Sequence, residues 1–146
     1  MPTLSSLTLD HANTLIAAAI KEGETKGFAP LAVCVLDAGG HVQAFQRADG
    51  ASMMRFEIAK GKAYGALAVG KGSRWLNAQA EGRPHFLEGL SNVSGGKIVP
   101  VPGGVLIKEE DGTLLGAVGI TGDTSDNDEI AALAGIAAIG KVAVTD

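Results

Sequence analysis

The sequence predicts an α+β fold, an antiparallel sheet with helices packed on it. Segments with helical spacing alternate with pairs of short apolar strands, in the order helix, two strands, helix, two strands, helix. Short turns, "DAGG" and "EEDG", join the strands of each pair, so the pairs are hairpins rather than crossovers. The chain has 146 residues, of which 46 % are hydrophobic and 19 % charged. This is enough for one core, and we expect one domain over residues 1–146.

The first helix is expected in "LTLDHANTLIAAAIKEGETKG". Thr8 or Asp10 can cap its start, and Gly27 can end it. The apolar run over residues 31–36 predicts a strand covered on both faces, and "HVQAFQR" predicts the strand that returns beside it. Cys34 is the only cysteine and lies in this apolar run, which predicts a buried thiol and no disulfide framework.

The second helix is expected in "SMMRFEIAKGKAYGALAVG", with Ser52 as its cap. Its residues are apolar or small nearly all the way round, which predicts a helix packed on more than one side. A short helix is expected over residues 74–81. The glycines and Pro84 that follow predict irregular structure, with one helical turn near residues 86–90.

The second hairpin is expected over residues 105–108 and 114–120, followed by a final helix over residues 125–142. In "TSDNDE", Ser125 and Asp128 have the spacing of a capping box, and acids in a first helical turn are stabilised by the helix dipole. Capping therefore accounts for these carboxylates without a ligand. A calcium loop would need the EF-hand spacing, and a phosphate cradle in "GAVGITG" would need a following Gly-Lys-Ser/Thr; the sequence has neither.

Arg55 and Lys62 are the candidate binding residues of the second helix. They are seven positions apart, so they lie on one stripe of the helix. In one interpretation they pair with nearby acids or extend to solvent. In the other they form an anion or carboxylate site, or the lysine has a lowered pKa. Arg47, at the mouth of the first hairpin, could join them.

His11, His41 and His85 show no ligand spacing with one another or with the cysteine, which argues against a structural zinc site or another intrinsic metal site. His85 lies in "GRPHF", where it is interpreted as an exposed loop residue or as an axial ligand or proton donor. The sequence has no nucleophile elbow, triad order or paired carboxylates, so it does not decide whether the protein is an enzyme.

Charge and hydropathy narrow the class of partner. A net charge of −4 gives no electrostatic footprint for nucleic acid. The start "MPTLSSLTLDHANTL" has no signal-peptide pattern, and no apolar run reaches membrane-spanning length. We therefore expect a cytoplasmic protein with no nucleic-acid or membrane partner. The low charged fraction predicts a surface partly covered by other copies of the chain.

Four stretches, "APLAVCVLDAGGHVQAFQRADGAS", "IAKGKAYGA", "VPGGVLI" and "GTLLGAVGITGDTSDNDEIAALAG", together resemble the GlcG/HbpS-like family, which includes the C-terminal domain of PduO-type proteins. The resemblance runs from about Asp10 to Ala138. It implies a profilin-like fold with a five-stranded antiparallel sheet, and assembly into dimers or larger oligomers. The matching positions are Asp37, Gly39, Gly40, Arg47, Asp49, Gly50, Lys62, Gly103, Gly104, Gly119, Gly122 and Asp128.

Characterised relatives bind haem, so the resemblance implies a haem-binding or haem-handling protein with haem as cofactor. Arg55 and Lys62 could then meet the propionates, and His85 or His41 could bind the iron.

A second hypothesis is a small enzyme or accessory protein of a catabolic pathway that binds a short oxo- or hydroxy-carboxylate. Lys62 and an arginine would hold that small-molecule ligand, and Gly103, Gly104 and Gly119 would let backbone amides approach it. A third is an oligomer with a structural role alone.

Overall fold

The computed structural model describes residues 7–146. Residues 1–6 belong to the stretch in which no targeting signal is expected, and they lie outside the described residues. The expected α+β fold with a five-stranded antiparallel sheet is confirmed. Its elements are α1 (Leu9–Lys26), β1 (Ala32–Asp37), β2 (Val42–Arg47), α2 (Arg55–Val69), α3 (Ser73–Gly82), α4 (Pro84–Val93), β3 (Gly104–Lys108), β4 (Leu114–Thr121), α5 (Ser125–Ala138) and β5 (Val142–Val144).

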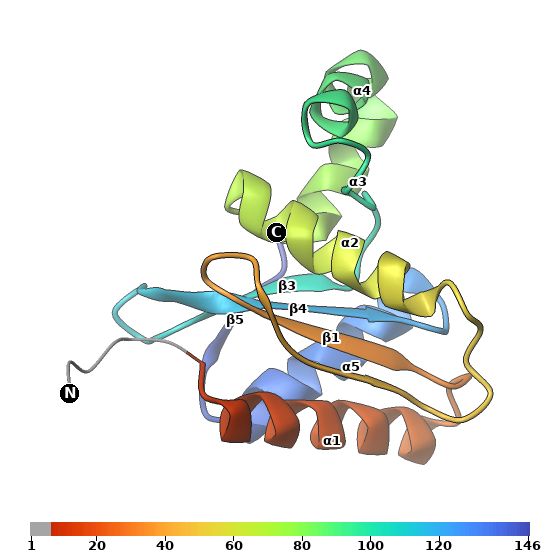
Figure 1. Cartoon of the computed structure of the whole chain (residues 1–146), viewed down its shortest axis with the longest axis vertical. Coiled ribbons are helices and arrows are strands. Elements are labelled where there is room, and N and C mark those ends of the chain that lie inside the picture. The colour runs from red at the N-terminus through yellow and green to blue at the C-terminus, as the bar shows by residue number, and fades with distance from the viewer. Residues whose placement is uncertain (1–6) are drawn as a thin grey trace.

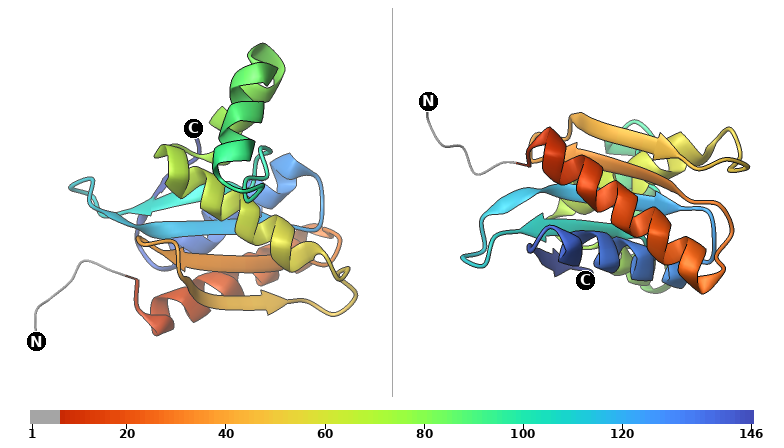
Figure 2. Two further views of the ribbon diagram at one scale, coloured as in Figure 1. Left: turned by 45° about the horizontal axis from the view of Figure 1, so that its top comes forward. Right: turned by 90° about the horizontal axis from the view of Figure 1, so that it is seen from below.

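The sheet has the strand order β2-β1-β4-β3-β5, and every neighbouring pair is antiparallel. Helices α1 and α5 lie side by side under one face, and α2 crosses the other face, as Figures 1 and 2 show. Both hairpins predicted from the sequence are present: β1 pairs with β2, and β3 with β4.

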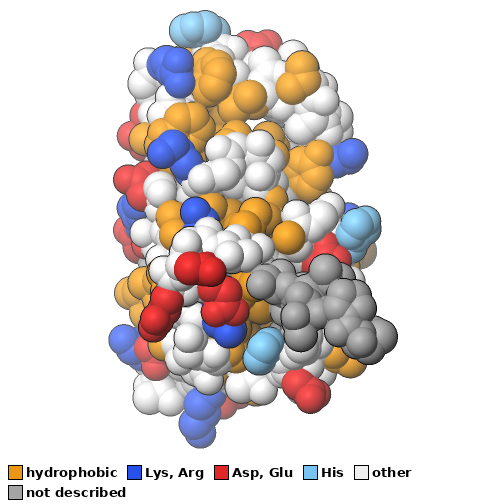
Figure 3. Space-filling model, turned by 90° about the vertical axis from the view of Figure 1, so that its left-hand side faces the viewer, with side chains coloured by type: hydrophobic (Ala, Val, Ile, Leu, Met, Phe, Trp, Pro, Cys, Tyr) orange, Lys and Arg blue, Asp and Glu red, His pale blue; other side chains and the backbone are white. Residues whose placement is uncertain are grey.

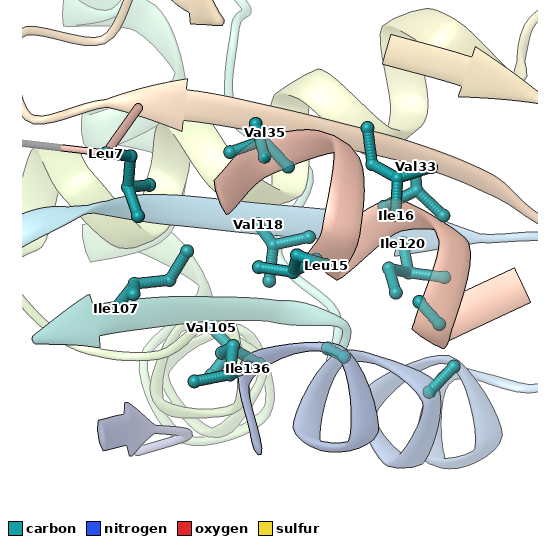
Figure 4. Close-up of a cluster of buried hydrophobic side chains, with 14 of the residues drawn as sticks. Leu7, Leu15, Ile16, Val33, Val35, Val105, Ile107, Val118, Ile120 and Ile136 are labelled. Carbon is teal, nitrogen blue, oxygen red and sulfur yellow. The ribbon is translucent and has the colours of Figure 1, made fainter. Parts of the chain in front are cut away.

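The sheet separates two apolar clusters because successive side chains of a strand point to opposite faces. In β1, Val33 and Val35 face α1 and α5 (Figure 4), whereas Cys34 and Leu36 face α2. This explains why the run over residues 31–36 is apolar at every position. The prediction of a buried thiol is confirmed, and burial raises the pKa of Cys34 to about 11, so it is an unreactive thiol at neutral pH.

Helices α3 and α4 form an arm that projects from the body (Figure 1). Among the elements of the described chain, α4 contacts only α3, and none of its residues is buried. Figure 3 shows hydrophobic side chains, with Lys and Arg among them, over the upper part of the molecule where the arm lies. The arm is therefore the part of the fold with the least contact with the core.

The caps of the helices agree with the sequence in part. In α1, Thr8 Oγ1 accepts a hydrogen bond from the backbone N–H of His11 and Gly27 ends the helix, as predicted. The predicted cap Ser52 is wrong: the residue before α2 is Met54, two positions later, and the Ser52 carbonyl accepts from the N–H of Arg55. The predicted capping box at Ser125 is also wrong, because its neighbour Thr124 caps α5.

Two segments differ from their predicted structure. The turn expected near residues 86–90 is a full helix, α4, because Pro84 lies in its first turn, where a missing N–H has no cost. The final helix ends at Ala138 rather than at residue 142. Gly140, with φ of 67°, then turns the chain so that the last residues add strand β5 beside β3.

Candidate functional site

Arg55 and Lys62 lie on the stripe of α2 that faces the sheet, so the prediction that they share one side of the helix is confirmed. The guanidinium of Arg55 donates to Thr121 Oγ1 at 2.7 Å, at the end of β4. The ammonium of Lys62 donates to the carbonyl of Ile120 at 2.8 Å and to Asp128 Oδ2 at 3.0 Å.

The ion pair of Lys62 and Asp128 is buried, with the two side chains 2 % and 1 % exposed. Asp128 Oδ1 also accepts the backbone N–H of Asp123 at 2.9 Å, so both carboxylate oxygens have a partner. Burial lowers the pKa of Lys62, although the negative charge of Asp128 acts in the other direction. Burial likewise raises the pKa of Asp128, although the positive charge of Lys62 acts to lower it. The lysine thus has an internal carboxylate partner and is closed to solvent.

The predicted glycines Gly103, Gly104 and Gly119 lie under α2 rather than beside an open space. A Cβ on Gly119 would overlap the carbonyl oxygen of Ala59, and one on Gly104 would overlap that of Lys62. A Cβ on Gly103 would lie 2.9 Å from Nζ of the same lysine. These glycines allow the backbone of α2 to lie directly on β3 and β4.

The structure does not bring Arg47 together with this buried pair. Arg47 lies at the exposed end of β2 and donates to the backbone carbonyl of Ala51, in the loop that leads to α2. Its hydrogen bond closes that loop.

The outer side of α2 borders a groove of about 500 Å³, which we call the α2 groove. Its volume is within the range of about 300–1,000 Å³ that small-molecule sites usually have. It is lined by residues from the tip of the first hairpin, from α2 and its N-terminal cap, and from the segment between α4 and β3: Gly40, Met54, Phe56, Glu57, Ile58, Lys60, Gly61, Tyr64, Gly96, Lys97 and Val99.

The segment that follows α4 forms one wall of the α2 groove. Gly95 and Gly96 have φ of 75° and 78°, which turns the chain back over α2. Val99 then donates its backbone N–H to the carbonyl of Gly61 at 3.2 Å. A Cβ on Gly61 would lie 2.5 Å from Val99 Cγ2, so the glycine allows this close contact. The prediction that α2 is packed on more than one side agrees with this arrangement.

The walls of the α2 groove are largely apolar, and its charged residues are mainly basic. Phe56 packs edge-on against Phe45 of β2, with ring centroids 4.8 Å apart, which fixes its ring. Lys60 and Lys97 supply two ammonium groups and Glu57 one carboxylate. The ammonium of Lys97 lies 5.7 Å from the ring centroid of Tyr64.

Of the two candidate histidines, His41 is next to a residue of the α2 groove and His85 is on a different element. His41 follows Gly40, a groove residue, and its side chain is 81 % exposed, with Nδ1 3.2 Å from Asp37 Oδ1. His85 is exposed on α4 and is not among the groove residues. Its neighbours Pro84 and Leu87 line a separate hollow of about 310 Å³ beside the arm.

Sequence reasoning missed the outer stripe of α2, which contains Phe56, Glu57, Lys60, Gly61 and Tyr64. Their spacing of one, three, one and three residues is that of one helical face, so periodicity could have identified it. It also missed Asp128 as the partner of the buried lysine, because the two residues are 66 positions apart. No local pattern reports a contact of that kind.

Among residues 7–146, no three His, Cys, Asp or Glu side chains gather as a metal cluster requires. Over the same residues, no helix has the length and apolar character needed to cross a membrane.

Comparison with known proteins gives one family and a set of similar folds. Residues 7–137 match the family model described as "Haem degrading protein HbpS-like". A comparison with curated proteins gives no match.

Three solved structures show the similarity of the fold. A PduOC complex with haem has a TM-score of 0.85 and 27% sequence identity, over 97% of this chain and 99% of that chain. The Klebsiella pneumoniae protein ORFY has a TM-score of 0.83 and 25% identity, over 96% and 94%. A double mutant of Streptomyces reticuli HbpS has a TM-score of 0.79 and 25% identity, over 94% and 89%.

Proposed function

The chain belongs to the HbpS-like family, and from this premise we propose that it binds haem in the α2 groove. The observation that carries the proposal is an apolar groove with two lysines on the outer face of α2. The similar PduOC structure is a complex with haem, which supports the same class of ligand.

The groove residues suit the two chemical parts of haem. Phe56, Ile58 and Val99 offer apolar surface to the macrocycle, whose burial is favourable by about 25 cal/mol per Å². Lys60 and Lys97 offer ammonium groups to the two propionates, which are anionic at neutral pH. When bound, haem supplies an iron centre whose reactivity depends on the axial ligand and the polarity around it.

These roles move the propionate contacts from the inner to the outer side of α2. Sequence reasoning assigns them to Arg55 and Lys62, but Lys62 is closed to solvent and already paired with Asp128. Arg55 is only half-buried, yet its guanidinium is bound to Thr121. His41 is kept as a candidate iron ligand because it follows Gly40 at the rim of the groove.

The contacts around Lys62, on the side of α2 that faces the sheet, leave no place for a short carboxylate to bind. The ammonium lacks solvent exposure, and the glycines expected to bring amides toward a ligand are covered by the helix backbone. We therefore retain haem as the proposed ligand.

Hemin titration of the purified protein tests the proposal. Wild type should give a saturable Soret shift with one haem per chain. Ile58→Glu places a carboxylate in the apolar wall beside Glu57 and should weaken binding at least about tenfold, since an unpaired charge in an apolar site costs several kcal/mol. Ile130→Glu is the matched control, because Ile130 is exposed on α5, which packs on the opposite side of the sheet from α2.

The control variant should bind hemin as wild type does. The absence of a saturable shift in wild type would overturn the proposal of haem binding. Equal affinity in wild type and Ile58→Glu would place any bound haem outside the α2 groove.

A further inference from the structure

We propose that the phenol oxygen of Tyr64 is an axial ligand of the haem iron, an inference that rests on the proposed haem binding in the α2 groove. Iron in haem proteins is bound axially by His, Cys, Met or Tyr. Among the residues that line the groove, Met54 and Tyr64 are the two of these types. The choice between them follows from their position and their chemistry.

Tyr64 is held on a rigid element, and Met54 is not. Tyr64 lies within α2, on its outer stripe, and its half-buried ring packs at the edge of the apolar cluster beneath the helix. Met54 is the residue before the first turn of α2 and is 62 % exposed, and the neighbouring Met53 is 88 % exposed. A ligand from a packed helix loses less freedom when it binds a metal than one from an exposed helix end.

The phenol oxygen of Tyr64 is free to bind. Among residues 7–146, no hydrogen bond to this oxygen is present, whereas Ser73, Thr121 and Thr124 all bond through their hydroxyls. The Tyr64 oxygen could therefore bind iron without breaking a hydrogen bond to another part of the protein. Ferric iron also favours an anionic oxygen over a soft thioether.

Lys97 supplies the complementary charge. Its ammonium lies 5.7 Å from the centroid of the Tyr64 ring. When the phenol oxygen of Tyr64 binds the iron, its O–H bond breaks and the proton is released to solvent. The resulting phenolate carries negative charge, which a neighbouring cation stabilises in a partly desolvated site. The carboxylate of Glu57 lies in the same groove and opposes this effect, but Lys60 lies one turn along the same stripe and offsets it.

The cysteine and the histidines fit this role less well. Cys34 is fully buried beneath α2, on the side away from the groove. His85 is on the arm, outside the groove residues. His41 follows the groove residue Gly40 and fits less well for two reasons. Its ring is hydrogen-bonded to Asp37 through Nδ1, and its side chain is 81 % exposed, so it is not held against an apolar ligand.

The test compares hemin with metal-free protoporphyrin IX in wild type and in Tyr64→Phe, with His41→Ala and His85→Ala as matched variants. Phenylalanine keeps the ring and removes only the oxygen. Tyr64→Phe should weaken hemin binding about 10-fold or more, the loss seen when even indirect support of a metal ligand is removed. It should leave protoporphyrin IX binding unchanged, because that macrocycle has no iron to ligate.

Resonance Raman spectra of the hemin-loaded protein give the second readout. Phenolate ring modes, enhanced through charge transfer to iron, should be present in wild type and in both histidine variants and absent from Tyr64→Phe. If wild type binds hemin saturably without these modes, or if His41→Ala alone changes the spectrum, the assignment of Tyr64 is overturned while haem binding stands. If wild type binds neither porphyrin, the proposed function itself fails.

Discussion

Lys62 and Asp128 are buried together between α2 and the start of α5, although burial disfavours the charged form of each residue. The raised pKa of Asp128 means that its contribution to stability is fully present below its unfolded pKa and is lost as the pH rises through its folded pKa. The lowered pKa of Lys62 means that its contribution is present above its unfolded pKa and is lost as the pH falls through its folded pKa. Near pH 7 the ion pair is therefore kept at a net cost of desolvation.

Removing one partner of this pair should destabilise the fold far more than removing both. Lys62→Met leaves a buried carboxylate without its cation, and Asp128→Asn leaves a buried ammonium without its anion. Each should lower the free energy of unfolding by about 3–5 kcal/mol. The double variant should lose clearly less than the sum of the two, because it leaves no unpaired charge. Urea unfolding at pH 7 measures all three.

Lys141→Met is the control for this prediction. Lys141 pairs with Glu109 at 2.8 Å, but this pair is partly exposed, so the same substitution should cost no more than about 1 kcal/mol. Additive losses in the double variant would show that the two buried groups do not act as a pair.

Sequence reasoning could place this lysine but could not find its partner. The seven-residue spacing puts Arg55 and Lys62 on one stripe, and the apolar character of α2 signals that a cation there needs a counter-charge. Capping is a sufficient local explanation for the acidic cluster at the start of α5. Nothing in the sequence therefore indicates that the side chain of Asp128 is buried and pairs with a lysine. Only the folded arrangement, in which the Lys62 side chain of α2 extends past the end of β4 to the first turn of α5, brings the two together.

At the scale of elements, the fold depends on how closely α2 lies on the sheet. Small residues make this contact: Ala59, Ala63 and Ala66 on the helix and Gly104 and Gly119 on the strands. The close approach of α2 to the sheet places its outer stripe beside the segment of residues 97–99. The position of the α2 groove is thus set by packing on the opposite side of the helix.

Gly119→Ala should test this contact. The added methyl group would overlap the carbonyl oxygen of Ala59. That oxygen belongs to the helix backbone, and a Cβ is fixed by its own backbone, so no side-chain rotation can relieve the overlap. We expect a loss of at least about 2 kcal/mol in the free energy of unfolding, together with weaker hemin binding as α2 is displaced. Thermal unfolding and hemin titration measure the two effects.

Gly89→Ala is the matched control, because a Cβ there meets no atom within 4 Å and the residue lies within helix α4. It should stabilise the protein by up to about 1 kcal/mol through helix propensity alone. A similar effect of the two substitutions would contradict the close contact of α2 with β4.

The elements themselves were largely predictable, and the exceptions have physical reasons. Alternating and continuous apolar runs identify β1 to β4, and caps identify α1. Strand β5 has only three residues, too few for a period-two pattern to be recognised, and the apolar residues of α5 run almost into it. The α2 groove combines a helix, a hairpin tip and a distant loop, so it depends on tertiary structure.

At the scale of the whole molecule, the two apolar clusters share the same strands. Residues of β1 and β4 contribute alternately to the cluster facing α1 and α5 and to the cluster facing α2. Loosening one face would therefore disturb strands on which the other depends. Two links join the arm to this body. Ser73 Oγ donates to the carbonyl of Val101 at 2.6 Å and accepts from the N–H of Gly104 at 2.7 Å, and the guanidinium of Arg74 pairs with carboxylates of α5.

This arrangement predicts that residues 7–146 unfold as one cooperative unit, as expected of a single domain. Trp75, the one tryptophan, lies on α3 and packs edge-on against Phe86 of α4, so its fluorescence reports the arm. Far-UV circular dichroism reports the helices of the whole molecule. The two signals should give coincident urea transitions. Ser73→Ala should lower the common urea midpoint and reduce the free energy of unfolding by about 1–3 kcal/mol. The reason is that it leaves the buried N–H of Gly104 and the partly buried carbonyl of Val101 without this partner. A fluorescence transition that precedes the dichroism transition in wild type would mean instead that the arm unfolds independently, since α4 has no contact with the sheet to couple it to the core.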